Sequence, residues 1–225
     1  RERLLTALDG YTPDRVPCAL SFCHVDLGTP SPAGAYRDDL VDVQFIQTPV
    51  SPKEQALAER VSNLPFDTRL GSPEQVLTYK RWDYHPEAPN QRNPLANART
   101  LDDLRAYPFP DVSGAYDVDR LSAEVAAWHA RGLGVGGNLP HLGGELFESA
   151  WRLRGLETFL LDLLRRPDWA DYLLDRLTAL ARRYAQTLAT AGVDVLALDD
   201  DVGMAGTMFV SPALWRRFFK PRMAE

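Results

Sequence analysis

The sequence predicts an α/β fold with a parallel sheet, on two observations. The run VDVLAL, residues 193–198, is short and apolar and does not alternate with polar residues. A strand of a parallel sheet has this pattern, because both of its faces are covered. Helical patterns flank the run on both sides, which indicates βα units. About four core strands are recognisable, whereas a closed (β/α)8 barrel has eight, so a barrel would be present only as its N-terminal half to two thirds.

The N-terminal part predicts one helix and two strands before an irregular region. The helix covers residues 2–8, and the apolar run of residues 16–23 is the first candidate strand. Residues 40–47 alternate apolar and polar side chains and form the second candidate. Prolines and turn residues are frequent over residues 49–110, where only a small hairpin near residues 76–85 is expected.

The C-terminal part is more regular. An amphipathic helix is predicted over residues 117–131, followed by a glycine-rich buried strand in 132–140. Residues 144–164 predict a helix or a helix pair, and residues 168–191 predict one long helix with an apolar stripe. Ser211 with Pro212 is a strong start signal for a last helix. Strands and helices therefore alternate over this part of the chain.

Composition excludes several classes of function. The chain has 225 residues, 25% of them charged, and a net charge of -6 without a basic stripe, so no nucleic acid partner is expected. It has no apolar run of the roughly 18 residues that span a membrane, and its first residues lack a signal-peptide core. We expect a cytoplasmic protein with a single domain, residues 1–225. Cys18 and Cys23 are too few for a disulfide framework and are expected to be structural thiols.

Three consecutive aspartates follow VDVLAL, at the place where a parallel sheet has its functional edge. The loops after the carboxyl ends of parallel strands form the active sites of α/β folds. Adjacent carboxylates raise the pKa of at least one of them, as a proton-transfer site requires. Asp199 and Asp200 are therefore candidate catalytic residues, and Asp201 is expected to be solvated. The alternative is structural, with one aspartate capping the next turn and the others in water.

Other residues near strand ends are weaker candidates. Asn138 and His141 follow a predicted strand in a glycine-rich turn and are candidate substrate contacts. His24 ends the first strand and is a candidate of the same kind. Glu145 and Glu148 are assigned to the first turns of a helix, where acidic residues stabilise the helix dipole.

Four segments, taken in order, resemble the uroporphyrinogen decarboxylase superfamily. They are RERLLTALDGYTPDRVP, NPLANARTLDDLRAYPFPD, ELFESAWRLRGLETFLLDLLRRPDWADYLLDRL and LDDDVGMAGTMFVSPALWRRFFKPR. The resemblance implies a single TIM barrel with a deep cleft at the C-terminal rim. It also implies a chain that is incomplete at its C-terminus, because members of the family continue beyond the KPR segment.

Two motifs separate the reactions of this superfamily. Its decarboxylases carry two arginines after the first strand that bind substrate carboxylates, and the matching positions here are Phe22 and Asp26. The aspartate of the decarboxylase pattern FDSWAG matches Asp199, and its serine matches Asp200. Each lost charge-assisted pair weakens binding by about 1.5 to 3 kcal/mol. The resemblance therefore favours the branch of corrinoid-dependent methyltransferases, with Phe22 as a pocket residue.

Zinc and a corrinoid are the cofactors that this branch implies, with the zinc activating a thiol. Its zinc ligands form a His-x-Cys pattern with a later Cys, and neither His24, His85, His129 nor His141 has that pattern. No metal ligand is assigned. The expected partners are a small-molecule substrate, a corrinoid protein and a second copy of the chain in a homodimer. Two alternatives stay open: decarboxylation of a porphyrinogen, and a non-catalytic barrel that binds a corrinoid or a partner subunit.

Overall fold

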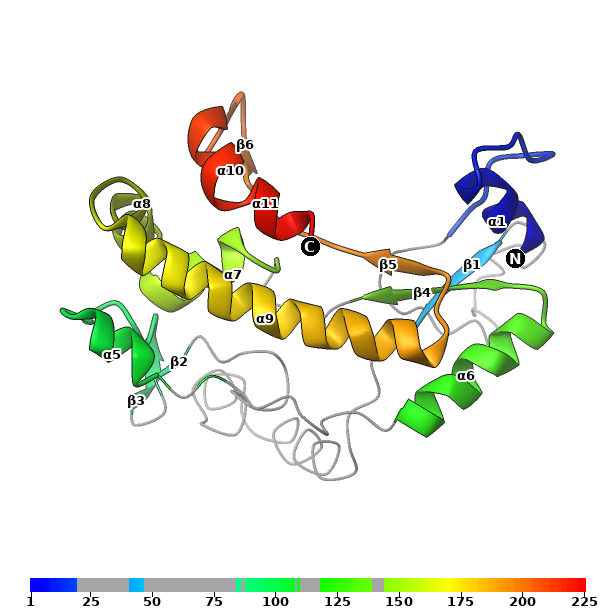
Figure 1. Ribbon diagram of the computed structural model, residues 1–225, viewed down its shortest axis with the longest axis horizontal. Helices are drawn as coiled ribbons and strands as arrows, with labels where there is room; N and C mark the ends of the chain where they lie inside the picture. Colours follow the sequence, from blue (N-terminus) through cyan, green and yellow to red (C-terminus); the bar gives the residue numbers. More distant parts are fainter. Residues whose placement is uncertain (20–40, 47–83, 86–87, 108, 110–117, 139–143) are drawn as a thin grey trace. The chain divides into compact units, whose positions relative to one another are not determined.

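The computed structural model describes residues 1–19, 41–46, 84–85, 88–107, 109, 118–138 and 144–225 (Figure 1). The chain divides into two compact units. The first unit contains Arg1–Pro49, Tyr116–Leu139 and Ala185–Ala197. The second unit contains Val50–Ala115, Pro140–Tyr184 and Leu198–Glu225.

The first unit is built on a parallel sheet. Strands β1 (Val43–Ile46), β4 (Gly134–Asn138) and β5 (Val195–Ala197) pair in the order β1-β4-β5, and both pairs are parallel. Ala19 forms an isolated parallel bridge with Val43, at the place of the first predicted strand. The predicted α/β class with a parallel sheet is therefore confirmed.

Close packing explains the glycines of β4. A Cβ atom at Gly134 would lie 2.5 Å from Leu4 Cδ2, and one at Gly137 would lie 2.9 Å from Leu188 Cδ1. One at Gly136 would lie 2.6 Å from Cδ1 of Phe45. Real side chains cannot approach so closely, so glycine lets the neighbouring elements contact the backbone of β4.

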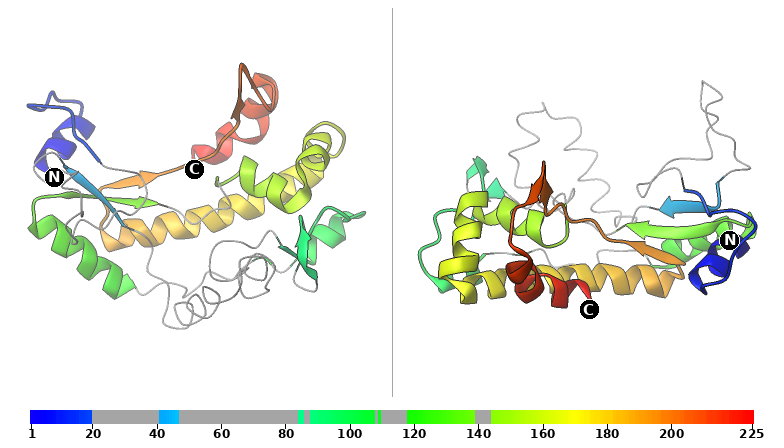
Figure 2. Two further views of the ribbon diagram at one scale, coloured as in Figure 1. Left: turned by 180° about the vertical axis from the view of Figure 1, so that it is seen from behind. Right: turned by 90° about the horizontal axis from the view of Figure 1, so that it is seen from above.

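Three helical segments lie beside this sheet (Figure 2): α1 (Glu2–Leu8), α6 (Val118–Ala130) and the last turns of α9 (Pro167–Ala191). Their bounds agree with the helices predicted from residues 2–8, 117–131 and 168–191. Leu121 and Val125 of α6 are fully buried, as its apolar spacing predicted. At the end of α6, His129 Nε2 lies 2.8 Å from Asp194 Oδ2, which ties the helix to the segment before β5.

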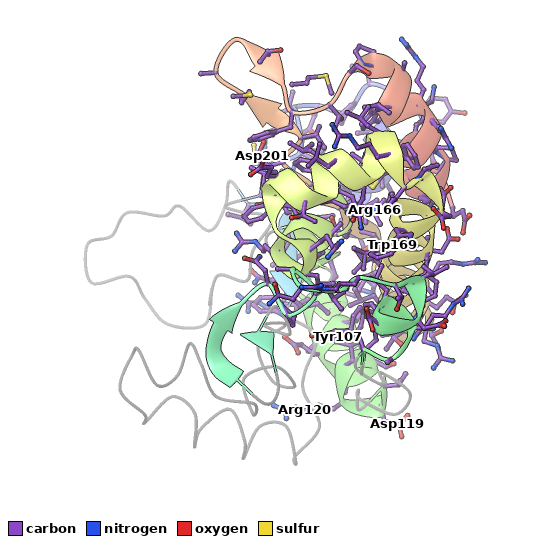
Figure 3. The ribbon with its side chains drawn as sticks, turned by 90° about the vertical axis from the view of Figure 1, so that its left-hand side faces the viewer. Tyr107, Asp119, Arg120, Arg166, Trp169 and Asp201 are labelled. Carbon is purple, nitrogen blue, oxygen red and sulfur yellow. The ribbon has the colours of Figure 1, made fainter. Side chains whose placement is uncertain are left out.

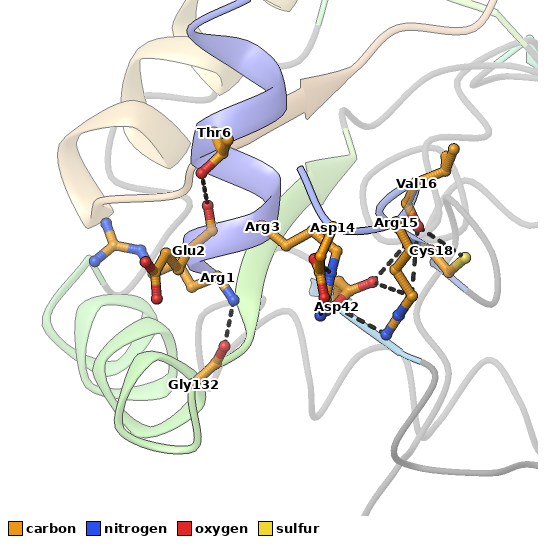
Figure 4. Close-up of polar contacts among 10 residues, drawn as sticks. All are labelled: Arg1, Glu2, Arg3, Thr6, Asp14, Arg15, Val16, Cys18, Asp42 and Gly132. Carbon is orange, nitrogen blue, oxygen red and sulfur yellow. Dashed lines mark hydrogen bonds and ion pairs between the residues drawn. The ribbon is translucent and has the colours of Figure 1, made fainter. Parts of the chain in front are cut away.

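A buried aspartate fixes the N-terminal segment to β1 (Figure 4). Asp42 accepts hydrogen bonds from Arg15 Nη1 at 2.7 Å and from the Cys18 N–H at 3.0 Å, and it also binds Arg3. Burial raises the pKa of Asp42, but the Cys18 N–H and the two guanidiniums outweigh this effect and hold the pKa below its usual value. These contacts anchor α1 and the turn after it.

Strand β5 differs from its prediction in burial. Leu196 is 36% exposed and Leu198, just after the strand, is 49% exposed, so the expectation that both faces are covered is wrong for the described residues. Within the part of the chain that the structure describes, β5 pairs with β4 alone. An edge strand has neighbours on one side only, and its side chains are correspondingly less covered.

The second unit is mainly helical. The segment predicted as a helix or helix pair forms two helices, α7 (Phe147–Arg154) and α8 (Leu156–Arg165), separated by Gly155 with φ +85°. The long α9 begins in this unit. Helix α10 (Pro212–Phe218) starts where predicted, with the Ser211 side chain accepting from the Leu214 N–H, and α11 (Lys220–Met223) follows. None of the described helices is both long and apolar enough to cross a membrane.

Two strand pairs and one helix of the second unit extend or correct the prediction. The antiparallel pair β2 (Tyr84–His85) and β3 (Ala88–Arg92) lies at the end of the predicted hairpin region. Helix α5 (Leu101–Arg105) was expected to be irregular, but Thr100 and Asp103 form a capping box at its start. A short hairpin of β6 (Gly203–Met204) and β7 (Thr207–Met208) follows the aspartates and turns at Gly206, where φ is +81°.

Aromatic rings fill the core of this unit around the start of α7. The ring centroid of Phe147 lies 6.1 Å from that of Phe159 and 5.8 Å from that of Phe219. Trp169 of α9 is buried, and the Arg166 guanidinium lies 4.4 Å from its ring centroid (Figure 3). The side chain of Phe147 thus fixes the start of α7 in the core.

Candidate functional site

The three aspartates have three different environments. Asp200 is half-buried, and its carboxylate accepts from two main-chain N–H groups, those of Phe147 at 2.7 Å and Glu148 at 3.0 Å. These are the first two residues of α7, whose N-terminal N–H groups lack partners within the helix. The residue before the helix, Leu146, has no capping side chain. Asp200 therefore caps α7 from a distant part of the sequence.

Glu145 both accepts a hydrogen bond from the main chain of Asp199 and donates one to it. The Asp199 N–H donates to Glu145 Oε2 at 2.7 Å, and the Glu145 N–H donates to the Asp199 carbonyl at 2.9 Å. Glu145 is only 5% exposed and lies in the turn before α7, so its assignment to the first helical turn is wrong. The helix begins two residues later, because its first free N–H groups are those that Asp200 satisfies. Glu148 does lie in the first turn, as predicted.

Gly144 lets the two segments come together. A Cβ atom at this position would lie 2.7 Å from Asp200 Cα and 2.9 Å from the Asp199 carbonyl oxygen. Ser149 Oγ donates to the Gly144 carbonyl at 2.5 Å, which folds the turn back onto α7. The turn of Gly144 and Glu145 is therefore packed directly against the aspartates.

Burial shifts the proton affinity of two carboxyls in this turn and loop. It raises the pKa of Glu145 to about 8, with the negative charges of Asp200 and Asp199 adding to the effect and the Asp199 N–H opposing it. Burial also raises the pKa of Asp200 to about 6. The hydrogen bonds from the two N–H groups of α7 oppose this rise, and the nearby Glu148 carboxylate adds to it. At neutral pH these shifts favour a protonated Glu145 beside an ionised Asp200.

The two other aspartates are more accessible to solvent through their side chains or are only half-buried. Asp201 is exposed, as expected, and its Oδ1 accepts from the Gly203 N–H at 3.2 Å. Asp199 is half-buried, and its carboxylate makes no hydrogen bond to any residue that the structure describes. Its main chain is held at both the N–H and the carbonyl by Glu145. Of the three, Asp199 is the one with a fixed main chain and an uncommitted carboxylate.

The remaining predicted site residues are placed only in part. Asn138 ends β4 as the partner of Ala197 in β5, while the placement of its side chain is not described. Phe22, His24 and His141 lie outside the described residues. The structure thus brings together Asp199 and Asp200 and adds Glu145, which sequence reasoning assigned to the helix dipole. No pattern along the sequence pointed to Glu145, because its contact with Asp199 joins residues 54 positions apart.

A metal site does not form among the residues described. No group of three or more His, Cys, Asp or Glu side chains there is arranged to hold a metal ion. The carboxyls of Glu145, Asp200 and Asp201 accept from main-chain N–H groups. The described residues therefore do not fit a zinc ion.

Comparison with known proteins supports the fold and adds a family match over part of the chain. A solved structure of a methyltransferase from Methanosarcina mazei is similar, with a TM-score of 0.56, 18% identity, and coverage of 98% of this chain and 64% of that one. This likeness supports the α/β fold, and the chain spans about two thirds of that structure. Residues 147–225 match the family model of uroporphyrinogen decarboxylase (URO-D). The predicted resemblance to the uroporphyrinogen decarboxylase superfamily is confirmed over these residues. Comparison with curated protein sequences gives no match.

Proposed function

We propose that this protein is an enzyme of the uroporphyrinogen decarboxylase superfamily that transfers a methyl group between a corrinoid and a thiol. Its fold is a single-domain TIM barrel, and Asp199 contacts the substrate at the rim. Asp200 acts indirectly, by holding the loop to α7. The protein is cytoplasmic and works with a corrinoid protein, as a monomer or a homodimer.

The observation that carries this proposal is the environment of Asp199. Its carboxylate is uncommitted among the described residues, while its main chain is fixed by two hydrogen bonds. A group that must meet a substrate needs both properties, since an immobile backbone fixes the geometry and a free side chain supplies the contact. The likeness to a methyltransferase structure and the match over residues 147–225 support the choice of family.

Zinc enters this proposal only through the resemblance. When bound, zinc would lower the pKa of a thiol so that the thiolate attacks the methyl carbon. The described residues offer no fitting set of ligands, so no step is assigned to a zinc-bound species. The roles derived from this chain are those of Asp199 as the substrate contact and of Asp200 and Glu145 as its support.

The direct test is to incubate the protein with methylcobalamin and a small thiol and to follow demethylation of the corrinoid by its visible spectrum. We expect the wild-type protein to turn over methylcobalamin. D199N is expected to reduce the turnover at least about tenfold, since one positioned polar contact typically contributes that much or more. The matched control is D201N, which changes the neighbouring exposed aspartate and is expected to keep turnover. Demethylation that neither variant affects would remove Asp199 from the reaction.

Decarboxylation is the second candidate, because the matching family model is that of uroporphyrinogen decarboxylase. Against it stand Phe22 and Asp26, where decarboxylases carry arginines for the substrate carboxylates. Consumption of uroporphyrinogen with release of carbon dioxide, and no demethylation of methylcobalamin, would establish this reaction instead. Corrinoid binding without either reaction would indicate a non-catalytic barrel.

A further inference from the structure

We propose that Glu145 is a neutral positioning residue, which keeps its proton at neutral pH and fixes the main chain of Asp199 so that the Asp199 carboxylate is presented to the substrate. The role of Asp199 in this inference rests on the proposed function. The state of Glu145 and its hold on the loop do not, and they are tested separately below.

The first step is geometric. Glu145 Oε2 accepts from the Asp199 N–H at 2.7 Å, and the Glu145 N–H donates to the Asp199 carbonyl at 2.9 Å. Two hydrogen bonds to one residue from the same partner fix both the position and the direction of its peptide groups. Gly144 adds close packing, because a Cβ atom at this position would lie 2.7 Å from Asp200 Cα. The Asp199 main chain is therefore held by Glu145, whose side chain comes from a segment 54 residues earlier.

The second step concerns the proton. Glu145 Oε1 is buried and has no hydrogen-bond partner among the residues described. A carboxylate oxygen carries part of a full negative charge, and burying such a charge without a donor costs far more than burying a neutral hydroxyl. A protonated carboxyl still lets Oε2 accept from the Asp199 N–H. The neutral acid is therefore the form that suits this position.

The charges around Glu145 favour the same form. The loop presents the carboxyls of Asp199 and Asp200, and Asp201 lies next to them. Helix α7 adds Glu148, whose carboxylate is paired at 3.6 Å with Arg152 of the same helix. Of these groups, Asp200 and Asp199 act directly on Glu145, and both are acidic. A negative charge at Glu145 would be repelled by them, and a proton removes that repulsion.

The test compares three variants with the full protein. E145Q imitates the neutral acid, with an amide oxygen that can accept from the Asp199 N–H. E145A removes the acceptor. E157Q makes the same change as E145Q at an exposed glutamate in the first turn of α8 and serves as the matched control.

The first readout is infrared spectroscopy at pH 7, which needs no substrate. The difference between wild type and E145Q is expected to contain the carbonyl band of a protonated carboxylic acid, whereas the difference for E157Q contains carboxylate bands. Loss of carboxylate bands in E145Q would show an ionised Glu145 and overturn the proposal. Titration of the same band to pH 9 is expected to remove it in wild type and to leave E145Q unchanged.

The second readout separates positioning from catalysis. In the methylcobalamin assay E145Q is expected to keep kcat within about twofold, and E145A to lower it about tenfold. The double variant E145A/D199N is expected to be no slower than D199N, because Glu145 acts through Asp199. Effects of the two changes that multiply would show an independent role and contradict the positioning. If neither the wild-type protein nor any variant demethylates methylcobalamin, the proposed function fails. The infrared result still decides the protonation state of Glu145.

Discussion

Replacing Asp200 by alanine removes the acceptor of two main-chain hydrogen bonds at the start of α7. The bonds from the Phe147 and Glu148 N–H groups measure 2.7 and 3.0 Å, and the residue whose carboxylate receives them is half-buried. Loss of an aspartate cap costs about 0.5 to 2 kcal/mol, and each buried N–H left without an acceptor costs about 1 to 3 kcal/mol. Removal of the burial cost of the Asp200 charge, and then of its repulsion by Glu148, offsets part of this. We expect a loss of about 2 to 3 kcal/mol in the free energy of unfolding.

The assay is urea unfolding of the full protein at pH 7.5, where Asp200 is ionised, followed by circular dichroism and tryptophan fluorescence. D200N keeps one acceptor oxygen and is expected to lose about half as much as D200A. D201A, in which an exposed carboxylate with one hydrogen bond is removed, is expected to stay within about 0.5 kcal/mol of wild type. Equal stability of D200A and D201A would refute the cap, since the two positions differ in their contacts with α7.

Three further predictions follow from the same contacts. G144A places a Cβ 2.7 Å from Asp200 Cα, and calorimetry should show a destabilisation of about 1 to 3 kcal/mol unless the loop moves away. R154A removes the 2.7 Å bond from Arg154 Nε to the buried Asp162 and the bond from Arg154 to the Ala96 carbonyl, while Arg166 stays paired with Asp162, and urea unfolding should show a loss of about 2 to 3 kcal/mol. The raised pKa of Glu145 means that the folded state holds a proton that the unfolded chain releases near pH 4.5. Stability should therefore fall as pH rises from about 5 to 8, by up to about 1.4 kcal/mol per pH unit for Glu145. Asp200, with its pKa raised to about 6, adds to the slope below about pH 6, so E145Q should lose the slope between about pH 6 and 8 and keep part of it below.

Local signals explain what the sequence could predict. The bounds of α1 agree with the apolar spacing of residues 2–8, and α10 starts at the Ser211 and Pro212 signal. The position of Asp199 and Asp200 after an apolar run was enough to place them directly beyond β5. Each of these features depends on residues that are close in sequence, and such patterns determine secondary structure directly.

Distant contacts explain what the sequence did not predict. The role of Glu145 depends on Asp199, and the cap of α7 depends on Asp200, each more than fifty residues away in the chain. A pattern along the chain does not reveal which acid will meet which helix end. The exposure of Leu196 has the same origin, because burial of a strand depends on its neighbours in the sheet and not on its own residues.

The most direct test of the account is to measure kcat/KM for methyl transfer and the free energy of unfolding together, for D199N, D200N and D201N. We predict that D199N loses activity at least about tenfold while its stability stays within about 0.5 kcal/mol of wild type, because its carboxylate supports no described contact. D200N should lose stability, and D201N should lose neither. A D199N variant that turns over substrate as fast as D201N would contradict the central claim that Asp199 is the carboxylate this loop presents to the substrate.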